Sequence, residues 1–69
     1  MNPEELKQLT RFFRTKFQLP TIEVRKRVQK KDSAEVYIGD EFIGVLFVDD
    51  EDEERAYNFQ MAILGTDLE

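Results

Sequence analysis

Residues 34–48, AEVYIGDEFIGVLFV, decide the fold of this 69-residue chain. Apolar and polar side chains alternate from 34 to 39, which is typical of a β-strand with one buried face. A second apolar run of strand length covers 42–48, and residues 39–41 between the runs are the glycine and acidic residues that tight turns favour. The stretch therefore predicts an antiparallel β-hairpin.

The length of the turn sets which sides of the two strands meet. A two-residue loop at 40–41 pairs Ile38 with Ile43, so that apolar residues lie opposite each other. A loop at 39–40 suits a type II′ turn better, because Gly39 then takes the positive φ. Both loops leave the same side of the second strand on the core, whereas a three-residue loop, which we disfavour, would exchange its sides. The predicted core face of the hairpin is Val36, Ile38, Ile43, Val45 and Phe47.

A helix is predicted before the hairpin, over residues 3–18. Asn2 can cap its first turn, Pro3 suits the first helical position, and Glu5 follows the cap by three residues, as in a capping box. Pro20 ends the helix, because the residue before a proline avoids the helical region. Apolar residues recur on one side at helical spacing: Leu6, Leu9, Phe13 and Phe17, with Phe12 at the margin.

Two further strands flank the hairpin. Residues 21–28 alternate apolar with charged side chains, as an edge strand does, and residues 56–64 alternate most regularly. Short links favour an antiparallel meander. We therefore predict an α+β fold in which one N-terminal helix packs on a four-stranded antiparallel meander sheet (α-β-β-β-β). Residues 1–69 form a single domain, with an acidic loop at 49–55.

The strand at 42–48 is apolar on both sides, and one helix cannot cover both faces of a four-stranded sheet. One interpretation is a central strand that is shielded by the long side chains of its neighbours. The other is a homodimer, or contact with another protein, because large apolar groups gathered on an open face are unusual for a monomer. The residues predicted for self-association are Tyr37, Phe42, Leu46 and Val48.

The charges divide between the two halves of the chain. Residues 1–31 hold nine basic and three acidic residues, whereas residues 32–69 hold one basic and twelve acidic residues, for a net charge of −5. The basic half offers a possible anion or nucleic-acid patch, namely Arg25, Lys26, Arg27, Lys30 and Lys31, which the basic side of the helix could extend. The acidic chain and the lack of interleaved aromatic residues make nucleic acid the less favoured partner.

Catalytic and metal chemistry is poorly represented. The chain has no Cys and no His, which excludes disulfides and zinc fingers and removes the usual general base. We expect no enzyme activity, no cofactor and no small-molecule substrate. Asp50 and Asp52 resemble the start of an EF-hand loop, but Arg55 stands where that loop needs glycine, so no metal site is expected. The acidic run could instead meet Lys30 and Lys31 of a neighbouring subunit.

The location expected from the sequence is the cytoplasm, with no membrane association. No stretch reads as a signal peptide, and the longest apolar run is too short to cross a bilayer. Segments 20–25, 32–47, 49–52 and 57–64 together resemble a small alphaproteobacterial family of uncharacterised proteins, a domain of unknown function. The resemblance implies a short bacterial cytoplasmic protein and supplies no activity, cofactor or site residue.

Overall fold

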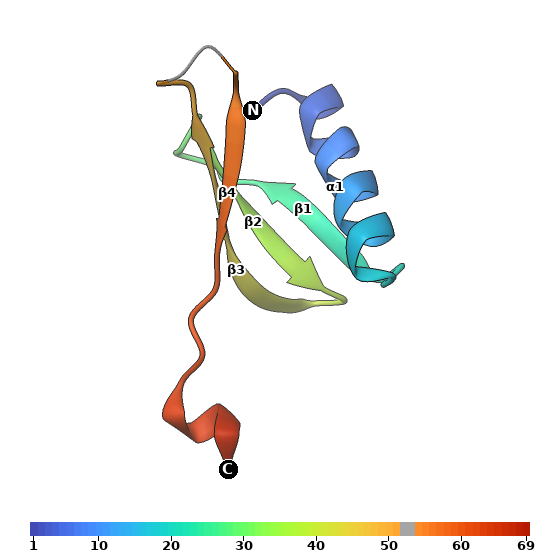
Figure 1. Cartoon of the computed structure of the whole chain (residues 1–69), viewed down its shortest axis with the longest axis vertical. Helices are drawn as coiled ribbons and strands as arrows, with labels where there is room; N and C mark the ends of the chain where they lie inside the picture. Colours follow the sequence, from blue (N-terminus) through green and yellow to red (C-terminus); the bar gives the residue numbers. More distant parts are fainter. Residues whose placement is uncertain (52–53) are drawn as a thin grey trace.

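The computed structural model describes residues 1–51 and 54–69, and it confirms the predicted α+β fold. The elements in chain order are α1 (Pro3–Phe17), β1 (Ile22–Lys26), β2 (Ser33–Ile38), β3 (Glu41–Asp49), β4 (Ala56–Gln60) and a 3-10 helix, η1 (Gly65–Leu68). The four strands form one antiparallel sheet in the order β1-β2-β3-β4. Figure 1 shows α1 beside β1 on one face of the sheet and the C-terminal segment running away beyond the end of β4.

The signals at both ends of α1 act as predicted. The Asn2 side chain accepts a hydrogen bond from the Glu5 backbone N–H at 2.7 Å, and the Glu5 side chain accepts from the Asn2 backbone, which completes the capping box. At the other end, Gln18 takes a left-handed conformation with φ of 53°, and its N–H donates to Arg14. The predicted face of the helix is correct for Leu9 and Phe13, which are buried, but Phe17 is exposed.

The hairpin turn is the two-residue loop at Gly39 and Asp40. Gly39 has φ of 61°, the positive value that a type II′ turn needs at its first position, and Ile38 pairs with Glu41. A β-bulge follows, because Tyr37 pairs with Phe42 whereas its neighbour Val36 pairs with Gly44. The bulge inserts one extra residue, Ile43, into β3.

This extra residue makes the predicted core face of β3 wrong for Val45 and Phe47, whereas Ile43 is partly buried and packs against the core as predicted. Beyond the bulge every side chain of β3 points to the face opposite to the one that a regular hairpin would give. Leu46 is only 2% exposed and belongs to the core, whereas Phe47 is 41% exposed on the face away from α1, here called the outer face. Val48 shares the core side of the strand with Leu46, and Val45 lies on the outer face with Phe47.

The predicted self-association set is divided by the same shift. Leu46 and Val48 do not lie on the outer face, because the bulge turns them toward α1. Tyr37 and Phe42 precede the bulge in the pairing and do lie there, with their rings in edge-to-face contact at 5.7 Å. The core that results joins α1 to three strands and consists of Leu9, Phe13, Ile22, Val24, Ala34, Val36 and Leu46.

Two strands are shorter than predicted. β1 ends at Lys26, and Val28 is 93% exposed in the following loop. β4 ends at Gln60, whose partner Val45 lies next to the bulge of β3. The residues that follow, 61–63, belong to no strand, and Met61 and Ile63 are largely exposed.

Among the described residues, neither helix is long and apolar enough to cross a membrane.

Candidate interaction surfaces

An apolar groove of about 1000 Å³ lies between α1 and β4. It exists because α1 packs against β1, at the opposite side of the sheet, and leaves the inner face of β4 partly uncovered. We call it the α1/β4 groove. Its apolar lining is Leu9, Phe12, Phe13, Phe17, Leu46, Ala56, Tyr57 and Phe59.

Phe13 organises the aromatic wall of this groove. Its ring stacks on Phe17 with centroids 5.5 Å apart, and it meets Phe59 of β4 edge-to-face at the same distance. Phe12 meets Phe13 edge-to-face at 6.1 Å. Phe12 and Phe17 remain 57% and 53% exposed, although aromatic side chains of this size contribute most when they are buried. The groove therefore presents apolar surface that its own chain does not cover.

A polar cluster closes one end of the groove. Glu5 is buried, accepts a hydrogen bond from the Tyr57 hydroxyl, and forms an ion pair with Arg55 at 3.1 Å. The Tyr57 hydrogen bond, with help from the Asn2 backbone and the Arg55 charge, lowers the pKa of Glu5 below its ordinary 4.5 against the opposing effect of burial. The same bond to Glu5 raises the pKa of Tyr57 above its ordinary 10.0. The cluster ties the first turn of α1 to the start of β4.

Replacing Tyr57 with phenylalanine is expected to lower the free energy of unfolding by about 1.5 kcal/mol at pH 7, because a buried carboxylate loses a hydrogen bond. The stabilisation from Glu5 is complete above pH 4.5 and lost as the pH falls through its lowered pKa. That from Tyr57 is complete below pH 10.0 and lost as the pH rises through its raised pKa. Urea unfolding at a series of pH values checks this.

The difference between wild type and Tyr57→Phe should therefore be largest between about pH 5 and 9.5 and should shrink on both sides of that range. Tyr37→Phe is the matched control, because Tyr37 also donates to a carboxylate, that of Glu35, but on the half-exposed outer face. A difference that stays constant from pH 3 to pH 8 would contradict the assigned role of Glu5.

The two edges of the sheet differ in how their backbone groups are satisfied. At the β1 edge, α1 supplies the partners: the Val24 N–H donates to Thr10 Oγ1 at 3.1 Å, and Arg14 Nε donates to the Ile22 carbonyl at 2.8 Å. Residues 23–27 of this edge also hold four charged side chains. Both features protect an edge strand from pairing with another chain.

The β4 edge has neither protection. The Val48 N–H donates to Asp32 on the β2 side, so the pair Val48–Tyr57 is one that does not exchange hydrogen bonds. By the same alternation, the backbone groups of Tyr57 and Phe59 point outward from the sheet. In the described part of the chain no hydrogen bond reaches them, and residues 56–66 hold no charged side chain.

A second apolar hollow, of about 850 Å³, lies along β3 beside the segment that follows β4. Phe42, Phe47, Met61 and Ile63 line it and are each at least 41% exposed. This hollow and the α1/β4 groove adjoin the same edge strand. Apolar surface thus flanks the unprotected edge on both faces of the sheet.

The predicted basic patch is dispersed by the structure. Arg25 turns to the outer face, where it pairs with Glu23 and Asp40 and lies 4.1 Å from the centroid of the Tyr37 ring. Its environment raises its pKa, chiefly through the hydrogen bond to Glu23. Of the remaining four, Arg27, Lys30 and Lys31 line a small hollow together with Ser33, whereas Lys26 lines the groove between α1 and β1.

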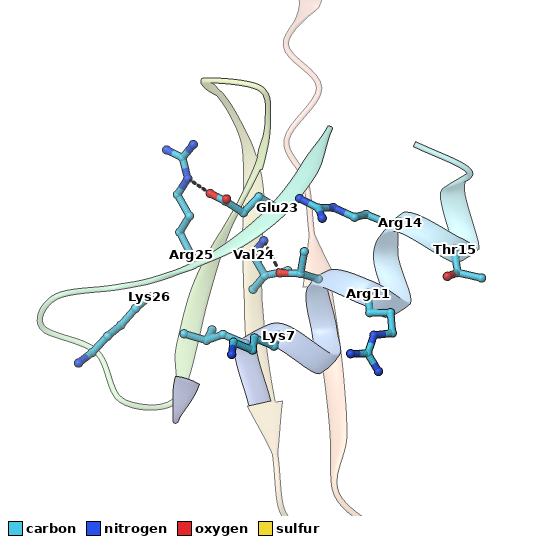
Figure 2. Close-up of a pocket in the computed structure, with 10 residues that line it drawn as sticks. Lys7, Arg11, Arg14, Thr15, Glu23, Val24, Arg25 and Lys26 are labelled. Carbon is cyan, nitrogen blue, oxygen red and sulfur yellow. Dashed lines mark hydrogen bonds and ion pairs between the residues drawn. The ribbon is translucent and has the colours of Figure 1, made fainter. Parts of the chain in front are cut away.

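A shallow basic groove of about 630 Å³ lies between α1 and β1 (Figure 2). Its cationic side chains are Lys7, Arg11, Arg14, Arg25 and Lys26. Figure 2 shows Arg25 bonded to Glu23 and directed away from the helix, whereas Arg11 projects from it. Of the predicted five, Arg25 and Lys26 line this groove with the basic side of the helix, although the Arg25 guanidinium points away from the helix.

Among its described residues, the acidic run provides one ion pair, which lies beside the α1/β4 groove. Asp50 pairs with Arg55 at 3.3 Å, so Arg55 bridges Asp50 and Glu5. Asp52 and Glu53, which the predicted loop and the EF-hand comparison both include, lie outside the described residues. Among the residues that are described, no three carboxylates gather where they could hold a metal ion.

Comparison with known proteins places the chain in a family. Residues 5–67 match the family described as "Protein of unknown function (DUF3126)". The chain belongs to this family. No curated protein and no solved structure matches it. The match covers nearly all of the chain and confirms the resemblance to an uncharacterised domain. Membership in DUF3126 names no activity.

Proposed function

We propose that this DUF3126 protein is a non-enzymatic interaction module that forms a homodimer through the free edge of β4. The observation that carries the proposal is the contrast between the two edges of the sheet. The β1 edge is charged and hydrogen-bonded to α1, whereas the β4 edge is uncharged and presents outward backbone groups at Tyr57 and Phe59. An open edge of this kind pairs readily with another strand.

A second copy is the natural partner for such an edge. Two β4 strands related by a two-fold axis are antiparallel, so each strand offers the other a complementary set of donors and acceptors. The pairing consumes both free edges, and the protected β1 edges then bound an eight-stranded sheet, so the assembly closes at two copies. A 69-residue domain without disulfides also gains stability when a partner subunit covers its exposed apolar groups.

Replacing Asn58 with lysine tests this dimer. Asn58 is exposed in the middle of β4 and points to the outer face with its partner Phe47, so the substitution leaves the core intact. A lysine on an edge strand opposes pairing with another chain. We expect wild type to scatter light as a species of twice 8.2 kDa at micromolar concentration and the variant to dissociate at least tenfold more readily.

Gln29→Lys is the matched control, because it adds the same charge in the exposed loop after β1. It should leave the dimer unchanged. Wild-type protein that remains an 8.2 kDa species throughout the micromolar range would rule out the proposed function.

Nucleic-acid binding is the second candidate, and the basic groove is the observation that favours it. Lys7, Arg11 and Lys26 line this groove and take part in none of the ion pairs of the described residues. Titration of a labelled duplex at ~50 mM salt, repeated at higher salt, is the measurement that separates nucleic-acid binding from self-association.

The cytoplasmic location and bacterial origin expected from the sequence stay predictions.

A further inference from the structure

We infer that the α1/β4 groove is the docking site for residues 61–63 of the second copy in the dimer. The inference rests on the proposed β4-edge dimer and adds to it the register of the two strands and the occupant of the groove. Each copy would place the three residues that follow its own β4 into the groove of the other. The exchange would be reciprocal.

The register follows from the alternation along β4. Outward backbone groups belong to Tyr57 and Phe59, and in an extended chain the same series continues at Met61 and Ile63. A two-fold axis at Gln60 pairs these positions with one another, so Met61 of the second copy lies opposite Phe59 and Ile63 of the second copy lies opposite Tyr57. This register uses only uncharged residues, because the axis lies near the middle of the uncharged stretch 56–66.

The same alternation decides the face on which the added side chains lie. Tyr57 and Phe59 point toward α1, since Tyr57 reaches Glu5 and the ring of Phe59 meets that of Phe13. Residues directly opposite in an antiparallel pair share a face of the sheet. Met61 and Ile63 of the second copy would therefore point toward α1 as well, into the α1/β4 groove.

The dimensions of the groove suit this segment. The part of α1 that lines it runs from Glu5 to Phe17, which is about 18 Å at 1.5 Å per helical residue. Residues 60–63 of the second copy, in extended conformation, span about 10 Å beside it. The chain's own segment does not take this place, because it continues beyond the end of β4 and away from the sheet (Figure 1).

The chemistry of the two surfaces matches. Met61 and Ile63 are 50% and 65% exposed in the single chain, and the aromatic wall of the groove is exposed through Phe12 and Phe17. Methionine sulfur packs favourably against aromatic rings, and burial of both partners removes apolar area from water in each copy. Each surface therefore exposes apolar side chains that docking of the other would bury.

The decisive experiment is an isotope-filtered NOE measurement on the native protein, with ¹³C-labelled and unlabelled copies mixed in equal amounts. We expect intermolecular contacts from the side chain of Met61 to the rings of Phe59 and Phe13, and from the side chain of Ile63 to the ring of Tyr57. A dimer by light scattering that lacks these contacts would overturn the inference and leave the proposed function standing. A monomer by light scattering would overturn both.

A pair of variants provides an independent readout. Ile63→Ser should weaken the dimer at least tenfold, because the side chain is lost from both symmetrical grooves. Leu68→Ser is the control, because Leu68 is 79% exposed in η1 and lies outside the docking segment. Equal dimer dissociation constants for Ile63→Ser and wild type would count against docking in the groove.

Discussion

Replacing Leu46 with alanine is expected to lower the free energy of unfolding by about 2–5 kcal/mol, which is a large part of the stability of so small a domain. Leu46 is 2% exposed at the centre of β3, between Ala34 of β2 and Phe59 of β4, and it also lines the floor of the α1/β4 groove. Loss of its side chain leaves a cavity that rigid sheet neighbours cannot fill. Urea unfolding at a fixed protein concentration measures the effect.

Phe47→Ala is the matched control, because it removes a larger side chain from the adjacent position. Phe47 is 41% exposed on the outer face, so its truncation should cost about 1 kcal/mol or less. The comparison separates the two possible faces of β3: a regular hairpin without the bulge would bury Phe47 and make its loss the more costly. A larger effect for Phe47→Ala than for Leu46→Ala would show that β3 faces the other way.

The elements that the sequence predicts well are those with local causes. The capping box of Asn2 and Glu5 and the stop before Pro20 all act within a few residues, and α1 begins and ends within one residue of its prediction. The turn at Gly39 is likewise local, since it depends on one positive φ. Strand order follows from short connections, so the meander was predictable as well.

The face of β3 was not predictable, because its cause lies outside the hairpin. The bulge that exchanges the faces is placed where Gly44 meets Phe59 of β4, fifteen residues later in the chain. Reading Gly44 as a bulge residue was possible from the sequence, but the partner that selects it was not. The same shift divides the residues predicted for self-association. Tyr37 and Phe42 lie on the outer face as predicted, whereas Leu46 and Val48 lie on the core side.

For the candidate surfaces, too, the local features were predictable from the sequence and the features that depend on distant contacts were not. The uncharged stretch 56–66 is readable in the sequence, and so are the charges of residues 23–27. The contacts that cover the β1 edge are not readable, since Thr10 and Arg14 reach it only when α1 packs at the side of the sheet. That same placement of α1 opens the groove beside β4, so the protection of one edge and the exposure of the other have a single cause.

Gly44→Ala is expected to lower the free energy of unfolding by about 3 kcal/mol, because the site has no room for a methyl group. A Cβ at this position would lie 2.5 Å from the Gln60 carbonyl oxygen and 2.7 Å from Cε1 of Phe59. The nearer atom belongs to the backbone of β4, so relief requires a shift of the strand and not merely of a side chain.

The shifted strand is the one that carries the free edge, so Gly44→Ala should also weaken the dimer. Gly65→Ala is the matched control, since a Cβ there meets nothing within 4 Å and the φ of Gly65 is not positive. Urea unfolding and light scattering on both variants check the two effects. If Gly44→Ala unfolds at the same urea concentration as Gly65→Ala, then β4 does not pack over Gly44, and the physical reason given for the bulge, and with it the orientation of Leu46, is wrong.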